Sequence, residues 1–198
     1  GNNITLKIIK KDQYNLSHGL EGAVFQLKKC TRNDNETITE DTDKSWNNRT
    51  TDSNGEIQFG EGTEDNPAMD YNTLYRVTEV TAPEGYVKDD TPHYIMVPRK
   101  ESGATEYPDY VKKCMEDARI SIQYQSIYEL TISNHKGEIT VEKKFKNPGG
   151  QDSNPVSGVY KFGLYEKSDA TNNDGTNTPK QKLLITYTAG DTGVKTAK

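Results

Sequence analysis

The sequence predicts an all-β protein, built as an antiparallel β-sandwich in two tandem domains. Three observations lead to this prediction: short segments in which apolar and polar residues alternate, turn signals between these segments, and a pattern of segments that occurs twice. Of the 198 residues, 31% are hydrophobic and 28% are charged, so the cores should be thin. Twelve tyrosines and the clustering of apolar residues argue against a disordered chain.

Strand-like alternation occurs in several short ranges before residue 136. Taken in order, these ranges are 4–10, 23–29, 56–59, 74–80, 93–97, 120–124 and 127–134. A polar stretch, residues 31–55, precedes the third range and ends in the turn sequence DSNG. We expect this stretch to be a solvated loop that leaves its tryptophan, Trp46, partly covered. Short strands separated by turns are typical of an antiparallel sandwich.

One segment has helical rather than strand-like periodicity. In residues 107–118 the apolar side chains recur at helical spacing, and Pro108 stands near the start, where a helix tolerates proline. We predict a short helix, inserted before the last strands of the first domain. Its simplest role is to cover a sheet edge or an open end of the sandwich.

A weak internal repeat divides the chain into two domains. The first two predicted strands have counterparts at residues 139–143 and 156–165. The predicted boundary gives a first domain of residues 1–136 and a second of residues 137–198. Because a small sandwich of this kind takes about 100 residues, the second domain should be truncated.

Composition and spacing exclude several classes of function. The formal net charge is −5 and the basic residues form no face, which argues against binding to nucleic acid. No apolar run approaches the ~20 residues of a membrane-spanning helix, so we expect no membrane span in this chain. The three histidines lie far apart and no metal-ligand spacing occurs, so neither a metal nor another cofactor is predicted. No site for an external substrate is visible, and a turnover enzyme is not indicated.

The state of the two cysteines is left open. Cys30 and Cys114 are too few for a disulfide framework and do not have the spacing of a C-x-x-C site. They could form a single disulfide bond outside the cell, or they could remain as two thiols. The sequence does not decide between these states.

One polar residue lies on the apolar face of each of three predicted strands: Lys10, Glu79 and Asn134. Side chains alternate between the two faces of a strand, so the register of the apolar neighbours should carry these residues into the core. Buried Lys and Glu are rare unless they are paired, because an isolated buried charge costs many kcal/mol. Three such residues, one basic, one acidic and one carboxamide, indicate a shared site.

The three side chains offer a specific reaction. Burial lowers the pKa of a lysine, and a neutral amine is a nucleophile. A buried, protonated Glu can donate a hydrogen bond to a carboxamide oxygen and so polarise the carbon. Attack of the Lys10 amine on the Asn134 carboxamide would form an amide and release ammonia, with Glu79 as the proton shuttle. The simpler alternative is a buried Lys10–Glu79 ion pair with Asn134 as a hydrogen-bond partner.

The residues around Glu79 carry a family resemblance. Residues 73–86 (TLYRVTEVTAPEGY) resemble the E-box of the collagen-adhesin B-type (CnaB) domains of Gram-positive surface adhesins and pilins. In that pattern an aromatic residue is followed four positions later by Glu, and then by Ala-Pro-x-Gly-Tyr. Residues 8–12 and 130–134 are similar to the first and last strands of the family, and residues 20–27 to its second strand. These segments lie across most of the first domain.

The resemblance implies an Ig-like β-sandwich with an isopeptide bond between Lys10 and Asn134, promoted by Glu79. In the second domain it offers Lys143 as a candidate isopeptide lysine, but no E-box follows. It also implies an extracellular protein at the bacterial cell surface, attached to the cell wall through sequence outside this chain. The expected function is a structural stalk module of a surface adhesin or minor pilin, beside other surface or pilus subunits. The alternative is a ligand-binding adhesin module that recognises an unknown host protein or glycan through its loops and insertion.

Two features depart from the family pattern. Lys11 is adjacent to Lys10, so a bulge in this strand could decide which amine points inward. Residues 101–119, which include the predicted helix, form an insertion that the resemblance does not assign.

Overall fold

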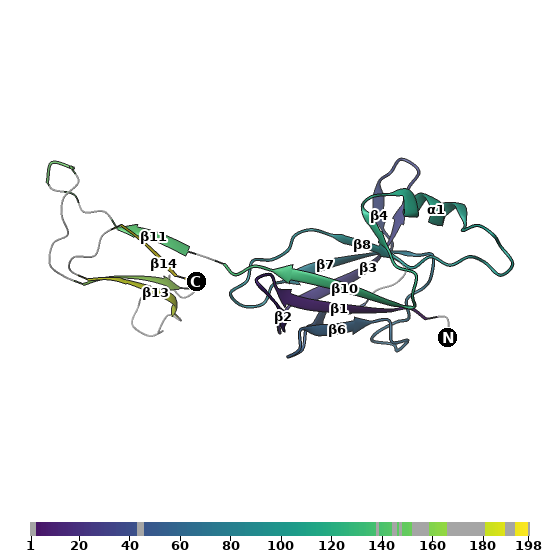
Figure 1. The fold of residues 1–198 in the computed structure, drawn as a ribbon, viewed down its shortest axis with the longest axis horizontal. Helices are drawn as coiled ribbons and strands as arrows, with labels where there is room; N and C mark the ends of the chain where they lie inside the picture. Colours follow the sequence, from purple (N-terminus) through teal and green to yellow (C-terminus); the bar gives the residue numbers. More distant parts are fainter. Residues whose placement is uncertain are drawn as a thin grey trace. The chain divides into compact units, whose positions relative to one another are not determined.

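The computed structural model describes residues 3–42, 46–137, 139–143, 146, 148–151, 159–165, 181–188 and 193–197. The chain divides into two compact units, residues 1–136 and residues 137–198. Strands predominate in both units, and α1 (Asp109–Glu116) is the one helix among the described residues (Figure 1). The prediction of an all-β fold is therefore confirmed.

The first sheet of unit 1 is built around its N-terminal strand, β1 (Thr5–Asp12). On one side β1 pairs in parallel with β10 (Ile127–Asn134). On the other side it pairs antiparallel with β6 (Glu56–Phe59) and, near its end, with β2 (Asn15–Gly19). Every second residue of β1 is buried, which is the alternation that the sequence predicted for this strand.

The second sheet of unit 1 has the strand order β4–β3–β7–β8–β9. The strands of this sheet are β3 (Val24–Arg32), β4 (Ile38–Glu40), β5 (Arg49–Thr50), β7 (Leu74–Thr81), β8 (His93–Met96) and β9 (Ile120–Ile122). The short strand β5 pairs with the beginning of β3, and β3 pairs antiparallel with β7 over most of its length. The E-box motif therefore starts on β7, in the middle of this sheet.

Two pairings correct the expectation that the sandwich would be antiparallel throughout. The strands β1 and β10 run parallel, and so do β8 and β9. Partners in a parallel pair need a long connection, and both pairs have one, since most of unit 1 separates β1 from β10 and the insertion separates β8 from β9. Alternation along a strand shows which of its two faces is buried, but it does not show whether the neighbouring strand runs parallel or antiparallel to it.

The inward faces of the two sheets form the main hydrophobic core. Leu6 and Ile8 of β1 meet Phe25 and Leu27 of β3 in one cluster, and all four side chains are fully buried. This cluster joins the two sheets and makes unit 1 a sandwich. Complete burial of an aliphatic or aromatic side chain stabilises the fold by roughly 1.5–3 kcal/mol.

Trp46 belongs to the same core, which corrects the solvated position that the sequence suggested. Its exposed fraction is 5%, and its ring lies edge-on to that of Tyr75 with 5.7 Å between the centroids. The indole Nε1 donates a hydrogen bond to the Pro67 carbonyl oxygen at 2.8 Å. A single aromatic residue in a polar stretch gives no periodic signal, so the sequence could not show that this segment folds over the core.

The helix α1 covers the outer face of the second sheet. Its buried residues Val111 and Cys114 form a second cluster with Cys30, Leu74 and three further residues of that sheet: Met96, Ile120 and, partly buried, Ile122. Leu74 and Met96 each neighbour a residue of the main core and therefore point to the opposite face. The predicted helix is present within residues 107–118, but it covers a sheet face rather than an edge or an open end.

Cys30 and Cys114 are free thiols in this second cluster. Both are buried, and burial raises the pKa of each thiol. A thiol with a raised pKa is protonated at neutral pH and reacts slowly, because the thiolate is the nucleophile. The two side chains therefore contribute to packing in the state that the structure shows.

Asp117 fixes the turn between α1 and β9 by accepting hydrogen bonds from two arginines. Its Oδ2 lies 2.8 Å from Arg32 Nε and 2.7 Å from an Arg119 guanidinium nitrogen. The hydrogen bonds from Arg119 and then Arg32 hold the pKa of Asp117 well below its usual range. The contact with Arg32 links the inserted segment to β3.

We predict that Asp117→Asn makes unit 1 less sensitive to acid. Because the folded-state pKa of Asp117 is lower than the ~3.9 of an unfolded chain, its contribution is complete above about pH 4 and is lost as the pH falls towards the folded-state value. Urea unfolding should show a free-energy difference between wild type and Asp117→Asn that shrinks below about pH 4. Asp109→Asn, at a side chain that is 97% exposed, is the control and should keep the wild-type pH profile. A difference that stays constant down to about pH 2 would contradict this role.

Unit 2 contains two strand pairs among its described residues. The strand β11 (Ile139–Lys143) pairs antiparallel with β14 (Gly193–Ala197), and β12 (Tyr160–Tyr165) pairs with β13 (Gln181–Tyr187). Part of the repeat predicted for this unit, residues 156–158, lies outside the described residues. That unit 2 is a truncated copy of the first domain stays a prediction.

Candidate functional site

Three polar side chains lie together in the core of unit 1. Lys10 comes from β1 and Asn134 from β10, which are neighbours in the first sheet, and Glu79 comes from β7 in the second. Their exposed fractions are 0%, 2% and 5%, respectively. Each stands two positions after a buried apolar residue, so the alternation of its strand carries it inward.

Glu79 lies between the other two side chains. Its Oε1 is 3.2 Å from Lys10 Nζ, and both of its carboxyl oxygens are 3.0 Å from Asn134 Nδ2. In the β1–β10 register, Lys10 lies opposite Ile132, two positions before Asn134. The structure thus brings together the three residues that the sequence selected, with the carboxyl group in contact with both prospective reactants.

Burial weakens the preference of the Lys10 amine for its charged form. Burial lowers the pKa of Lys10, while the nearby Glu79 carboxylate opposes that shift. The ring of Phe25, whose residue pairs with Glu79 across β3 and β7, lies 5.9 Å from Lys10 Nζ, a cation–π contact that also opposes the effect of burial. Removing charged groups from water is costly, so burial works towards an uncharged amine. The resulting amine is nucleophilic.

Asn134 Oδ1 is buried without a hydrogen-bond partner among the described residues, and Lys10 Nζ, which can donate three hydrogen bonds, has the Glu79 carboxylate at 3.2 Å as its polar contact. Leaving a buried polar atom unpaired costs ~1–3 kcal/mol. An amide between the two side chains would reduce the several N–H donors of Lys10 Nζ to a single N–H. A half-turn of the carboxamide would place its oxygen towards Glu79, where a protonated carboxyl group can donate to it.

The inward amine is that of Lys10 rather than Lys11. Lys10 is fully buried, whereas Lys11 is partly exposed and therefore lies on the other face of β1. The pairing of β1 with β2 does contain a register shift, but this irregularity falls between Lys11 and Asp12. It comes after Lys10 and leaves the alternation up to that residue intact.

Sequence reasoning missed Asp12, which lies on the same face of β1 as Lys10 and is 6% exposed. The Asp12 carboxylate accepts hydrogen bonds from the Tyr86 hydroxyl at 2.7 Å and from the Tyr14 N–H at 2.8 Å. Because Tyr86 ends the E-box motif, this contact joins the motif to the first strand. Extending the alternation of β1 by two positions would have found Asp12.

Asp89 and His93 were also missed, although Asp89 contacts the cluster and His93 contacts Asp89. The Asp89 N–H donates a hydrogen bond to Glu79 Oε2 at 2.7 Å, and His93 Nε2 lies 2.8 Å from Asp89 Oδ2. Asp89 belongs to the connection between β7 and β8, where no strand alternation is available to predict its position. No sequence signal could have placed its backbone amide on Glu79.

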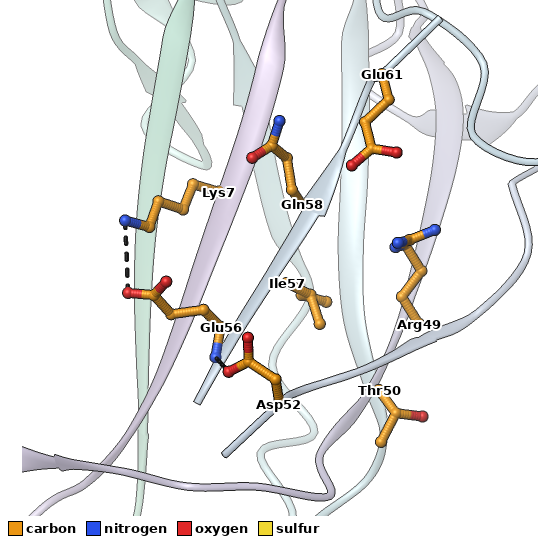
Figure 2. A pocket seen from close by; sticks show the side chains of 8 residues that line it. All are labelled: Lys7, Arg49, Thr50, Asp52, Glu56, Ile57, Gln58 and Glu61. Atoms are coloured by element: carbon orange, nitrogen blue, oxygen red, sulfur yellow. Dashed lines mark hydrogen bonds and ion pairs between the residues drawn. The ribbon is translucent and has the colours of Figure 1, made fainter. Parts of the chain in front are cut away.

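An open pocket of about 310 Å³ shares no residue with the cluster. It lies along β5 and β6, and Figure 2 shows that its charged side chains partly engage one another. Lys7 Nζ lies 3.4 Å from Glu56 Oε1, and Asp52 accepts a hydrogen bond from the Glu56 N–H. Pockets for small ligands are mostly apolar, whereas Ile57 is the one aliphatic residue of this lining. The pocket therefore indicates no class of ligand.

Lys143, the candidate lysine of the second unit, ends β11 and pairs with Gly193 of β14.

In the described part of the chain, no group of three or more His, Cys, Asp or Glu residues could hold a metal ion. None of the helical structure described there is long and apolar enough to cross a membrane.

Solved pilin structures are similar to this chain at low sequence identity. The pilus 2b backbone protein of group B streptococcus is 22% identical, with a TM-score of 0.40, and the match covers 68% of this chain and 42% of that protein. The major pilin subunit of Bacillus cereus is 19% identical, with a TM-score of 0.40 and coverages of 81% and 36%. A streptococcal ancillary pilin is 17% identical, with a TM-score of 0.45 and coverages of 100% and 50%. The chain therefore spans half the length of these proteins or less.

No curated protein matches the chain. A protein family does match, over residues 4–113, which is more than half of the chain. The matched residues include Lys10 and Glu79, and they run from the start of β1 into α1. The chain belongs to the family of SpaA prealbumin-like fold domains.

Proposed function

We propose that the chain is a structural stalk module of a Gram-positive pilus or surface adhesin, locked by an isopeptide bond between Lys10 and Asn134. In this proposal unit 1 is a domain of the CnaB subtype, as the E-box resemblance implies. The observation that carries the proposal is the buried cluster, in which Glu79 lies within 3.2 Å of the amine nitrogen and 3.0 Å of the carboxamide nitrogen. Membership of a structural, non-enzymatic family supports it.

The bond would form once, within one molecule. The neutral Lys10 Nζ attacks the Asn134 side-chain carbon while the Glu79 carboxyl group donates a hydrogen bond to the carboxamide oxygen. As the bond forms, Glu79 gives its proton to the carboxamide oxygen, takes a proton from the attacking nitrogen and delivers it to the leaving nitrogen, which departs as ammonia. The hydroxyl proton of the intermediate returns to Glu79 as the new carbonyl forms. The product is a secondary amide between the two side chains, and Glu79 returns to its starting state. The fold supplies the proximity that an uncatalysed aminolysis lacks.

The position of the bond suits a module that carries tension. The strands β1 and β10 lie side by side and run parallel (Figure 1), so the start of β1 and the end of β10 are at opposite ends of the pair. Tension that enters at the start of β1 would pass along this strand to Lys10, through the bond to Asn134, and out of the unit. The covalent path bypasses residues 11–133. The β-sheet hydrogen bonds of unit 1 would then bear little of the load.

Intact-protein mass spectrometry tests the bond directly. We expect the wild-type mass to be lower than the sequence mass by one ammonia, because the reaction expels one, whereas Lys10→Ala and Asn134→Ala should have their full sequence masses. Peptide mapping should then find a branched peptide that contains Lys10 and Asn134. A wild-type protein of unmodified mass, or a branch at Lys11, would contradict the assignment.

The proposal extends to the surroundings of the module. Its partners would be other surface or pilus subunits, and its attachment to the cell wall would use sequence outside this chain. Lys143 remains the candidate isopeptide lysine of unit 2.

A further inference from the structure

The connection between β7 and β8 reaches the buried face of Glu79. The Asp89 N–H donates a hydrogen bond of 2.7 Å to Glu79 Oε2, while Glu79 Oε1 is the oxygen that lies 3.2 Å from Lys10 Nζ. The Glu79 side chain is only 1% exposed, so water cannot readily replace this donor. Asn134 Nδ2 lies 3.0 Å from both oxygens, so the contacts that distinguish them are the Asp89 N–H on Oε2 and the Lys10 amine beside Oε1.

The backbone at Asp89 is held by its own side chain. Asp89 Oδ1 accepts a hydrogen bond from the Thr91 N–H at 3.0 Å, and Asp89 Oδ2 lies 2.8 Å from His93 Nε2. His93 is the first residue of β8 and pairs with Val77 of β7, so the imidazole stands on a rigid element. The Val87 N–H donates to the His135 carbonyl oxygen at 2.9 Å and fixes the beginning of the loop to the residue after β10.

We propose that Asp89 and His93 are positioning residues for isopeptide formation, because they hold the Asp89 N–H on Glu79 Oε2 and so make Oε1 the oxygen that carries the proton. This inference rests on the proposed function. A backbone N–H can only donate, so the oxygen it contacts acts as the acceptor, and the acid proton is placed on the other oxygen. That oxygen is the one facing the amine.

The assignment gives each oxygen of Glu79 one task in a balanced reaction. Oε1–H first donates to the Asn134 carboxamide oxygen as the C–N bond to Lys10 Nζ forms. That proton passes to the carboxamide oxygen, which leaves Oε1 free to take a proton from the Lys10 nitrogen and deliver it to the nitrogen of Asn134. The C–N bond of Asn134 then breaks as ammonia leaves, and Oε1 recovers its own proton from the hydroxyl of the intermediate as the new carbonyl forms. Oε2 keeps its hydrogen bond to the Asp89 N–H throughout, so the carboxyl group does not have to rotate during the reaction.

Cell-free synthesis of the full chain, with acid-quenched samples analysed by intact mass, measures the rate at which ammonia is lost. We expect Asp89→Ala and His93→Ala to slow this rate by about tenfold or more, the effect of misplacing one hydrogen bond in the transition state. Asp89→Asn should restore most of the rate, since its oxygen accepts from Thr91 and its NH2 group can donate to a neutral imidazole. His93→Gln, which keeps an N–H donor, should also recover part of the rate.

Asp90→Ala is the matched control, because Asp90 is in the same loop but its side chain is 83% exposed and forms an ion pair with Lys88, away from Glu79. Its rate should equal that of wild type. The fluorescence of the buried Trp46 reports whether each variant folds. If an alanine variant does not fold, His93→Leu, which fills the space of the ring but offers no hydrogen bond to Asp89, takes its place and should react slowly beside Asp90→Ala.

The outcomes separate this inference from the function on which it rests. A wild-type chain that never loses ammonia would overturn the proposed function. A wild-type chain that loses it, together with folded Asp89→Ala and His93→Ala variants that react at the wild-type rate, would overturn the positioning role alone. Slow reaction in both alanine variants without rescue by Asp89→Asn or His93→Gln would also contradict it, because a purely structural defect would then explain the loss.

Discussion

Replacing Lys10 with alanine is expected to lower the melting temperature of unit 1 by more than about 10 °C. The bond would close a loop from residue 10 to residue 134, and in the chain-entropy model closing a loop of about 100 residues stabilises by up to ~4.7 kcal/mol. For a unit of 136 residues, each kcal/mol corresponds to roughly 4 °C. Because only 31% of the residues are hydrophobic, the core should be thin, and a contribution of this size should be a large share of the free energy of unfolding. Calorimetry and timed trypsin digestion would both measure it.

Lys10→Met separates the bond from packing. Methionine keeps an unbranched apolar stem at a fully buried position but has no amine, so it should remove the bond with little loss of packing. We expect Lys10→Met to melt far below wild type, close to Lys10→Ala, and to become sensitive to trypsin. If Lys10→Met melted like wild type and only Lys10→Ala were destabilised, packing rather than a covalent bond would hold β1 in place, and the stalk proposal would lose its main support.

The buried faces of the strands could be predicted because they depend on a local rule. A period of two places Ile8 and Lys10 on one face of β1 whatever the rest of the chain does, and the same rule selected Glu79 and Asn134. The E-box pattern independently pointed to Glu79. The cluster was therefore accessible from sequence even though its members are far apart along the chain.

Features that depend on tertiary contacts could not be predicted in this way. The polar strand β2 has mostly exposed residues, and the two-residue strand β5 is too short to alternate, so pairing with β1 and β3 defines them instead. The parallel direction of β10 and the burial of Trp46 likewise depend on how distant segments meet. The position of the Asp89 N–H could not be predicted for the same reason, because no sequence pattern places a single backbone amide in the fold.

Replacing Glu79 with alanine is expected to abolish bond formation, so that the variant keeps its full sequence mass. Among the described residues, Glu79 is the one carboxyl group that contacts both Lys10 and Asn134, and without it no group there is placed to move a proton between the two nitrogens. General acid–base catalysis of this kind contributes about 10²–10⁴-fold to a rate, which would turn a completed reaction into an undetectable one on the time scale of expression. The lysine amine and the asparagine carboxamide should both be recovered unmodified by peptide mapping.

Glu79→Gln distinguishes proton transfer from simple filling of the site. Glutamine has nearly the same shape and can still donate to the Asn134 carboxamide oxygen, but it cannot accept and release a proton at neutral pH. We expect it to fold, as judged by the buried Trp46, and to lose ammonia much more slowly than wild type. Glu129→Ala, at an exposed position of β10, is the matched control and should react fully. If Glu79→Ala lost ammonia at the wild-type rate, burial of Lys10 beside Asn134 would suffice for the reaction, and the role of Glu79 would be limited to neutralising the buried amine.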